Sequence, residues 1–362
     1  MKIDFQNSFS GTRPVAEAYA FDLVRLSAWM RVHVEGFSGR LRAEQFKGGQ
    51  SNPTFLLEAD GRRYVLRRKP PGTLLPSAHA VEREYRVIRA LAGTAVPVAK
   101  TYALCEYTDV LGTPFYLMEY VAGRIFWDPA LPGMTPQERT AIFDEMNRVL
   151  SELHSVDPAA IGLADYGKPG SYIARQVARW TKQYRASETE RIEAADCLID
   201  WLPKHVPPGD ESRIVHGDYR LDNVVFHPDE PRILAVLDWE LSTLGHPLVD
   251  FAYHCMIWRM TAGERRGLAG LDLDSLGIPD ERSYLLRYLE RTARDTGASV
   301  SPAAWGYYLV FNMFRLVGIL QGVMARALQG NASSALALET GRRTRPLAEQ
   351  AWALAQQVDA LR

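Results

Sequence analysis

The strongest constraint on the fold is residues 214–238, where an apolar strand-like run, a polar loop and a hairpin pattern follow one another. The loop begins with His216-Gly217-Asp218, and Asn223 comes five residues after Asp218. Two further apolar runs then enclose a short turn, and Asp238 follows the second run directly. Such runs predict an antiparallel hairpin with adjacent open ends. Asn223 and Asp238 are therefore expected to lie side by side.

These polar residues suit phosphoryl-transfer chemistry. An amide oxygen beside a carboxylate is a donor set that Mg²⁺ accepts, because this ion prefers hard oxygen ligands and keeps some of its waters. We therefore expect Asn223 and Asp238 to be metal ligands. Asp218 is expected to accept a proton from a hydroxyl nucleophile, and Arg220 to bring positive charge to the transferring phosphoryl group.

The alternative interpretation of the same residues is purely structural, because Asp and Asn near a turn commonly form helix caps or Asx turns. The upstream strand, the hairpin and the terminal Asp238 together favour the catalytic interpretation. His216 is more typical of a hydrogen-bonded structural residue than of an acid–base catalyst. Asp250 is expected to brace the loop through hydrogen bonds. Glu240 fits a metal-site role and a solvated charge equally well.

The remaining sequence predicts a β-rich first part with one key helix and a larger, mainly helical second part, an α+β protein. We place the boundary just after Met118, which gives a first lobe of 1–118, including a helical extension at about 14–36, and a second lobe of 119–362. An Asp60-Gly61 pair between two strand-like runs predicts a hairpin turn. Strands are expected at 54–57, 63–67, 101–107, 114–120, 224–226 and 233–237, and helices at 14–36, after Ser77, 136–154, 173–185, 191–202, 282–295 and 302–327.

The segment from His216 to Asn223 resembles the catalytic loop of the aminoglycoside phosphotransferase-like branch of the protein-kinase-like superfamily. That family has His-Gly-Asp-x-x-x-x-Asn followed by a metal-binding Asp, where protein kinases have H-R-D-x-x-x-x-N and D-F-G. The resemblance implies a bilobal protein-kinase-like fold. It also implies a small-molecule kinase that uses ATP and Mg²⁺.

The resemblance extends to nucleotide-binding elements over roughly residues 40–260. The loop 48–52 corresponds to the phosphate-covering loop, the strand ending at Arg67 to the one that supplies the phosphate-pairing lysine, and 117–121 to the hinge that binds adenine through its backbone. The residues expected to bind the cofactor are Ser51, Asn52, Arg67, Glu84, Glu119 and Val121.

One departure concerns the phosphate-pairing lysine, because this chain has Arg67 in its place. Arginine grips phosphate bidentately and does not replace lysine conservatively. Residues 67 and 69 of a strand share one face, so Lys69 is an alternative, although we favour Arg67. Glu84 is the expected acidic partner.

Composition excludes several classes of protein. The 42 Lys and Arg balance 43 Asp and Glu, which argues against a general nucleic-acid binder. The three cysteines lack a C-x-x-C spacing, so a disulfide framework and a zinc ribbon are both disfavoured. The apolar stretch 306–325 is interrupted by Asn312, Arg315 and Gln321, which favours a buried helix over a membrane span. A cytoplasmic protein without a membrane partner is expected.

The phosphate acceptor is a hydroxyl-bearing small molecule whose identity the sequence leaves open. Residues 1–118 carry an excess of five positive charges and 119–362 an excess of only six negative ones, and the last 32 residues, 331–362, supply no acidic cluster for a polycationic aminoglycoside. Apolar residues after the metal site are candidates for the acceptor pocket or for the core: Trp239, Leu241, Leu244, Phe251, Tyr253 and Trp258. The runs 64–72 and 237–245 resemble a sub-branch found fused to acyl-CoA dehydrogenases and associated with phosphorylating hydroxyacyl-CoA.

Two further points stay open in the sequence. A nucleotide-binding protein without kinase activity is the alternative from another functional class, and Arg67 in place of lysine keeps it open. A C-terminal helix is a candidate contact for a homodimer, but the oligomeric state cannot be read from the sequence.

Overall fold

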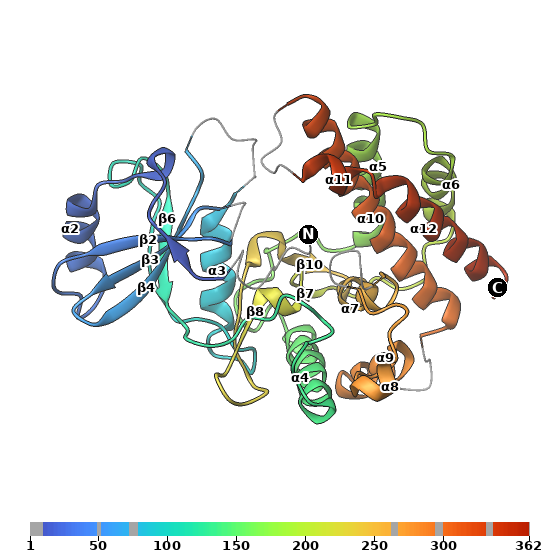
Figure 1. Cartoon of the computed structure of the whole chain (residues 1–362), viewed down its shortest axis with the longest axis horizontal. Helices are drawn as coiled ribbons and strands as arrows, with labels where there is room; N and C mark the ends of the chain where they lie inside the picture. Colours follow the sequence, from blue (N-terminus) through green and yellow to red (C-terminus); the bar gives the residue numbers. More distant parts are fainter. Residues whose placement is uncertain are drawn as a thin grey trace. The chain divides into compact units, whose positions relative to one another are not determined.

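The structure is a computed structural model of the 362-residue chain, and it describes residues 10–48, 52–71, 79–261, 267–293, 300–330 and 336–361. By its internal contacts the chain forms two compact units (Figure 1). The first unit contains 1–163, 220–242 and 271–280, and the second contains 164–219, 243–270 and 281–362. The predicted lobe boundary at Met118 falls inside the first unit, at the end of a strand, and stays a prediction.

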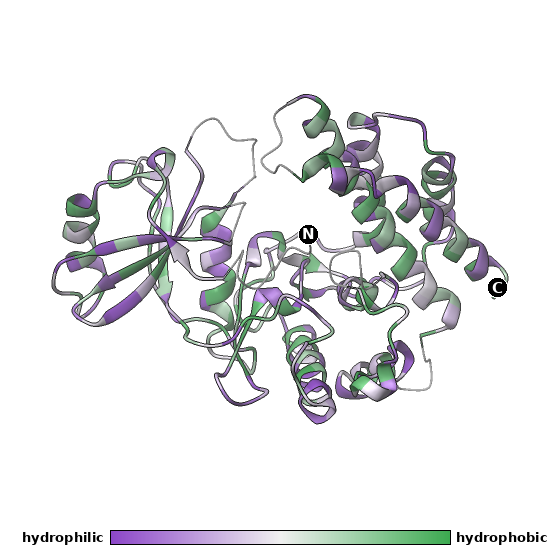
Figure 2. Cartoon of the chain, viewed as in Figure 1, coloured by the Kyte–Doolittle hydropathy of each residue, from purple (hydrophilic) through white to green (hydrophobic). Residues whose placement is uncertain are grey.

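The first unit is built on a six-stranded sheet with the order β1-β2-β3-β4-β6-β5, in which every neighbouring pair is antiparallel. The predicted hairpin turn is present, because Asp60 and Gly61 between β3 and β4 both have positive φ, 46° and 72°. Hydrophilic and hydrophobic stretches follow one another along these strands (Figure 2), and β4 has arginines at both ends and apolar residues in its middle. The strands are β1 Thr12–Arg13, β2 Arg42–Phe46, β3 Thr54–Ala59, β4 Arg62–Arg68, β5 Thr101–Cys105 and β6 Phe115–Glu119.

The predicted helix at 14–36 is wrong in its extent. The structure has a 3₁₀ turn, η1 Glu17–Tyr19, and then a separate helix, α2 Leu23–His33. The carboxylate of Asp22 accepts hydrogen bonds from the amides of residues 24 and 25, so the chain starts a new helix there. Within 14–36 only α2 is α-helical, and it packs on the sheet through Leu26 and Met30.

The two faces of β4 contact different helices. Leu66 belongs to the apolar cluster that α2 covers, whereas the next residue, Arg67, points to the face where α3 Val81–Leu91 lies. This follows from the two-residue period of a strand. The predicted cap of α3, Ser77, lies outside the described residues, and Ala80 occupies the cap position. The helix α4 Pro136–Ser155 begins with a capping box formed by Thr135 and Glu138.

A two-stranded hairpin of the first unit carries the predicted metal ligands. Strand β8 Val224–Phe226 pairs antiparallel with β9 Ile233–Val236, and Val224 lies opposite Val236. One carboxylate oxygen of Glu145 on α4 accepts a 2.9 Å hydrogen bond from the amide of Ile233. The hairpin is therefore fixed against a helix of its own unit. Short elements complete this part: η3 Leu221–Asn223, η4 Trp239–Leu241 and α8 Leu273–Leu276.

The second unit is helical around α10 Pro302–Leu328, which packs against α5, α7, α11 and α12. The 27-residue helix α10 is long and apolar enough to cross a membrane, but 72% of its most apolar 18-residue stretch is buried within the protein. The prediction of a buried helix is confirmed. The elements are α5 Tyr172–Ala186, α6 Glu193–Trp201, η2 Leu202–Lys204, β7 Arg213–Val215, β10 Thr243–Gly245, α7 Pro247–Cys255, η5 Met256–Trp258, α9 Glu281–Arg291, α11 Ala337–Gly341 and α12 Thr344–Asp359.

The predicted α+β class, with a β-rich first part and a mainly helical second part, is confirmed. The predicted strands and helices are present with end shifts of a few residues, apart from the first helix. The expectation that the helix after 282 reaches 295 falls partly on residues outside the described ranges. Strands β1, β2 and β10 were not predicted.

Candidate active site

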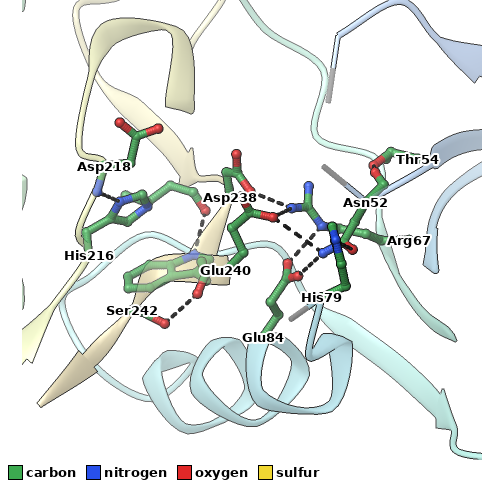
Figure 3. Close-up of polar contacts among 12 residues, drawn as sticks. Asn52, Thr54, Arg67, His79, Glu84, His216, Asp218, Asp238, Glu240 and Ser242 are labelled. Carbon is green, nitrogen blue, oxygen red and sulfur yellow. Dashed lines mark hydrogen bonds and ion pairs between the residues drawn. The ribbon is translucent and has the colours of Figure 1, made fainter. Parts of the chain in front are cut away.

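A buried arginine, Arg67, is the centre of the polar cluster in the first unit (Figure 3). Its Nε lies 2.8 Å from a carboxylate oxygen of Glu84 on α3, and its Nη2 forms ion pairs with Asp238 and, at 3.4 Å, with Glu240. The predicted pairing of Arg67 with Glu84 is therefore present. Glu240, left open between two roles, belongs to this cluster. One guanidinium bridges the sheet, α3 and the residues that follow the hairpin.

The pKa values of Arg67, Glu84 and Tyr116 in this cluster are all raised. Desolvation alone would lower the pKa of Arg67, but Glu84, Asp238 and Glu240 outweigh it, and its pKa lies well above the ordinary value. Burial raises the pKa of Glu84 more than Arg67 lowers it. Burial also raises the pKa of the Tyr116 hydroxyl, which donates to Glu84 over 3.2 Å.

Asn52 is fully buried and links two carboxylates of the cluster. Its amide nitrogen donates to Glu84 over 2.7 Å and, more weakly, to Glu240 over 3.5 Å. The Nδ1 of His79 lies 3.0 Å from its amide oxygen. The sequence predicted Asn52 as a nucleotide contact, and that role stays a prediction. His79 was not predicted, and its one sequence signal is its place just before α3. The other predicted residue of this loop, Ser51, lies outside the described residues.

The open end of the hairpin holds Asn223 and Asp238, as predicted. The backbone oxygen of Asn223 accepts a 2.8 Å hydrogen bond from the amide of Leu237, so the residues that precede and follow the two strands are adjacent. Asp238 has a positive φ of 63°, a backbone conformation that costs a non-glycine residue energy.

The donor set fits Mg²⁺. Its two oxygen types are an amide and a carboxylate, and the Asp238 side chain keeps 27% of its surface exposed, so an ion could reach it. Among the described residues no group of three or more His, Cys, Asp or Glu could hold a metal by itself. That agrees with the habit of Mg²⁺ of taking one or two carboxylates together with waters and phosphates.

The predicted adenine-binding hinge follows β6. Glu119 uses its amide to donate to the Lys100 oxygen over 2.8 Å, whereas the amide of Val121 has no hydrogen-bond partner in the part of the chain that the structure describes. Gly123 and Arg124 then pair with the hairpin, because the amide and oxygen of Arg124 both bond to Phe226 over 2.8 Å. A Cβ on Gly123 would lie 2.1 Å from the Phe226 oxygen, so only glycine fits there. The chain after the hinge is therefore held against β8.

The loop that carries Asp218 belongs to the second unit, in which Asp250 on α7 braces it. Its carboxylate accepts from the amides of His216 over 2.7 Å and Gly217 over 2.8 Å, which confirms the predicted bracing. His216 is fully buried, and its Nδ1 accepts from the Asp218 amide over 3.2 Å, as expected of a structural residue. The sequence did not predict that the Tyr253 hydroxyl donates to Asp218 over 2.6 Å.

Two predicted basic residues, Arg220 and Lys69, form salt bridges with neighbouring acidic residues. Arg220, in the first unit, pairs with Asp222 over 3.3 Å and keeps about a third of its side chain exposed. Lys69 pairs with Glu82 over 2.9 Å and not with Glu84. Most of the apolar candidates for the acceptor pocket are core residues, because all except Leu241 and Tyr253 are buried: Trp239, Leu244, Phe251 and Trp258.

A basic residue of the sheet paired with a glutamate of its helix, a hairpin flanked by Asn and Asp, and a loop with an Asp occur together in kinase-like phosphotransferases, which have lysine where this chain has Arg67. That is the class of protein that the fold and these residues define. The model of a family described as "Phosphotransferase enzyme family" matches residues 42–287, which is more than half of the chain. The chain therefore belongs to this phosphotransferase family.

Curated relatives carry another kind of name. The chain is 47% identical to mouse acyl-CoA dehydrogenase family member 10, 42% identical to Arabidopsis thaliana probable acyl-CoA dehydrogenase IBR3, and 41% identical to human acyl-CoA dehydrogenase family member 11. These matches cover 92% to 94% of this chain but only 32% to 43% of the relatives. The chain thus spans less than half the length of the relatives that it matches.

Solved structures agree on the fold. A Ralstonia eutropha protein named "putative aminoglycoside phosphotransferase" superposes with a TM-score of 0.85 at 59% identity, over 93% of this chain and 99% of that one. Aminoglycoside phosphotransferase APH(4)-Ia, in a ternary complex with ADP and hygromycin B, superposes with a TM-score of 0.57 at 16% identity, over 90% of this chain and 97% of that one. The second likeness concerns the fold alone.

Proposed function

We propose that this phosphotransferase is an ATP- and Mg²⁺-dependent small-molecule kinase that transfers the γ-phosphate to a hydroxyl group. The observation that carries the proposal is the joint presence of the braced Asp218 and the adjacent Asn223 and Asp238. Degenerate kinase-like proteins commonly lose one of these three residues, so their presence weighs against a nucleotide-binding protein without activity.

The residues of this chain divide the work. Asp218 accepts the proton of the acceptor hydroxyl, and Asp250 holds its loop through two backbone amides. Asn223 and Asp238 hold the metal ion, which when bound neutralises charge on the phosphate oxygens. Val121 offers its unpartnered amide to adenine. Most of the rate enhancement then comes from positioning and charge stabilisation.

A hydroxyacyl-CoA is our preferred acceptor class. The curated relatives described above carry acyl-CoA dehydrogenase names, and this chain matches a part of each. An aminoglycoside is a polycation and needs a strongly acidic pocket, whereas 119–362 carry an excess of only six negative charges. The aminoglycoside acceptor remains the second candidate, because the Ralstonia eutropha protein carries that name.

An ADP-release screen tests the proposal. The panel contains hydroxyacyl-CoAs, the matching free hydroxy acids, aminoglycosides and simple alcohols, each with Mg·ATP. We expect hydroxyacyl-CoA to stimulate ADP release and Asp218→Ala to abolish it while nucleotide binding is kept. Stimulation by aminoglycosides alone would overturn the acceptor class. Unchanged turnover in Asp218→Ala would overturn the assignment of the base, and nucleotide binding without turnover on any acceptor would favour the non-catalytic alternative.

A further inference from the structure

The carboxylate of Asp218 has a side-chain partner in its own unit, the hydroxyl of Tyr253. The distance from that hydroxyl to Oδ1 is 2.6 Å, which is the length of a charge-assisted O–H···O⁻ bond. A bond of this kind restricts rotation of the carboxylate about its side-chain torsions. Tyr253 therefore acts on the conformation of Asp218 directly.

Tyr253 and the brace of the loop backbone come from one helix. Asp250 and Tyr253 are three residues apart on α7, and residues at that spacing lie on the same face of a helix. Asp250 holds the amides of His216 and Gly217, and Tyr253 holds the side chain of Asp218. The face of α7 thus fixes both the backbone and the side chain of the loop.

Arg315 on α10 contacts the same loop and the same tyrosine. Its Nη2 donates to the Gly217 oxygen over 2.7 Å, and its guanidinium carbon lies 4.6 Å from the centre of the Tyr253 ring. The Trp180 ring lies 5.5 Å from the same carbon. Arginine over an aromatic face is an attractive cation–π arrangement, so Arg315 fixes the ring whose hydroxyl fixes Asp218.

Burial of the Arg315 guanidinium reduces the free energy of unfolding. Only 8% of the surface of Arg315 is exposed, and Arg315 forms no ion pair with any described residue. Taking a guanidinium out of water costs folding energy, and among the described residues its polar contacts are the Gly217 oxygen and the two aromatic rings. A role in packing alone would not require the charge.

We propose that Tyr253 and Arg315 are positioning residues that hold the Asp218 carboxylate in one orientation for proton transfer. The inference rests on the proposed function, in which Asp218 is the base. Misplacing a catalytic group by about 1 Å costs about a hundredfold in rate. The loss should affect turnover and leave nucleotide binding unchanged, because Asp218 is expected to contact the acceptor and not ATP.

The first test is Tyr253→Phe, which removes one hydroxyl and keeps the ring under Arg315. Its matched control is Tyr284→Phe, which removes a buried hydroxyl of the same unit that lies 2.9 Å from His254 Nε2. With the best acceptor of the screen, or water if none is found, we expect kcat of Tyr253→Phe to fall about ten- to hundredfold at unchanged KM for ATP. The control should stay within about twofold. An equal kcat in wild type and Tyr253→Phe overturns the inference.

A crystallographic comparison separates this inference from the proposed function. Structures of the wild type and of Tyr253→Phe show the Asp218 carboxylate directly, whether or not any acceptor turns over. We expect one conformer in the wild type and several, or a rotated one, in the variant. An unchanged single conformer in Tyr253→Phe overturns the positioning role. Absent turnover in the wild type contradicts the proposed function only.

Arg315→Met supplies a readout that a packing role would not give. The variant removes the hydrogen bond to the Gly217 oxygen and the cation–π contacts at similar volume, and we expect kcat to fall at least tenfold at unchanged KM for ATP. Arg315→Lys keeps the charge and should recover part of the turnover. A lower Tm with full turnover in Arg315→Met would show that the residue serves stability, and it would overturn this half of the inference.

Discussion

Arg67→Met tests whether the polar cluster of the first unit is held by charge compensation. The variant keeps most of the side-chain volume and removes the guanidinium from Glu84, whose side chain is only 1% exposed. An unpaired carboxylate at that depth does not stay charged, because it takes up a proton in the folded state. Folding then carries the free-energy cost of that protonation.

The magnitude follows from linkage. Protonating a carboxyl group of ordinary pKa about 4.3 at pH 7 costs about 3.7 kcal/mol, at about 1.4 kcal/mol per pH unit. Hydrogen bonds from Asn52 and Tyr116 stabilise the charged form and reduce this cost, so we expect a loss of about 2–4 kcal/mol at pH 7. In the variant the folded state binds more protons than the unfolded state above pH about 4.3, so its stability falls as pH rises.

Thermal or urea unfolding at pH 5, 6 and 7, followed by circular dichroism, measures this slope. The set contains the wild type, Arg67→Met, Glu84→Gln and the double variant. Because burial already raises the pKa of Glu84 in the wild type, stability falls with rising pH there too. We expect a steeper fall in Arg67→Met, so that the gap widens with pH, and Glu84→Gln to remove the difference in the Arg67→Met background. A gap below about 1 kcal/mol at pH 7, or one that does not vary with pH, would refute charge compensation as the cause.

Three further predictions concern other parts of the chain. Asp238→Ala should abolish the thermal shift produced by Mg·ATP, measured beside Mg-free ATP; an unaltered shift contradicts its role as a ligand. Burial lowers the pKa of His254 to about 4, so between pH 6.5 and 4 the unfolded state binds the extra proton and stability falls with falling pH. The loss should reach about 2 kcal/mol at pH 5 and be absent in His254→Gln, as read from unfolding curves. Gly123→Ala should lower Tm and raise KM for ATP, because its Cβ would meet the Phe226 oxygen at 2.1 Å; wild-type values in both would show that β8 yields.

The sequence predicted those parts of the fold whose signals are local. The hairpin at Asp60-Gly61 and the hairpin before Asp238 each combine a turn with two apolar runs, and both are present. The predicted extent of the first helix was wrong because the Asp22 carboxylate caps a helix that begins at residue 23. These local hydrogen bonds outweigh the apolar periodicity that continues across Asp22. Strand β2 escaped prediction because its residues Arg-Ala-Glu-Gln-Phe have little intrinsic strand preference, and the strand exists through its pairing with β3.

The candidate site was predictable where residues are close along the chain. Asp218, Asn223 and Asp238 share one short segment, so their chemistry could be inferred together. The contacts of Arg67 with Asp238 and Glu240 cross about 170 residues, and no spacing indicates them. Arg315 did leave a signal, since it is a charge inside an apolar helix, but its target, the Gly217 oxygen, required the tertiary structure.

The three polar interruptions of α10 have a consequence for anyone who alters this chain. Asn312 donates to the Val249 oxygen, Arg315 to the Gly217 oxygen and Gln321 to the Ser187 oxygen, over distances of 2.7–3.0 Å. Each side chain thus donates to a backbone oxygen of a different segment of the second unit. Inserting a single residue before Asn312 turns all three by about 100° at once. An insertion at that point of α10 therefore breaks contacts with three separate segments of the second unit.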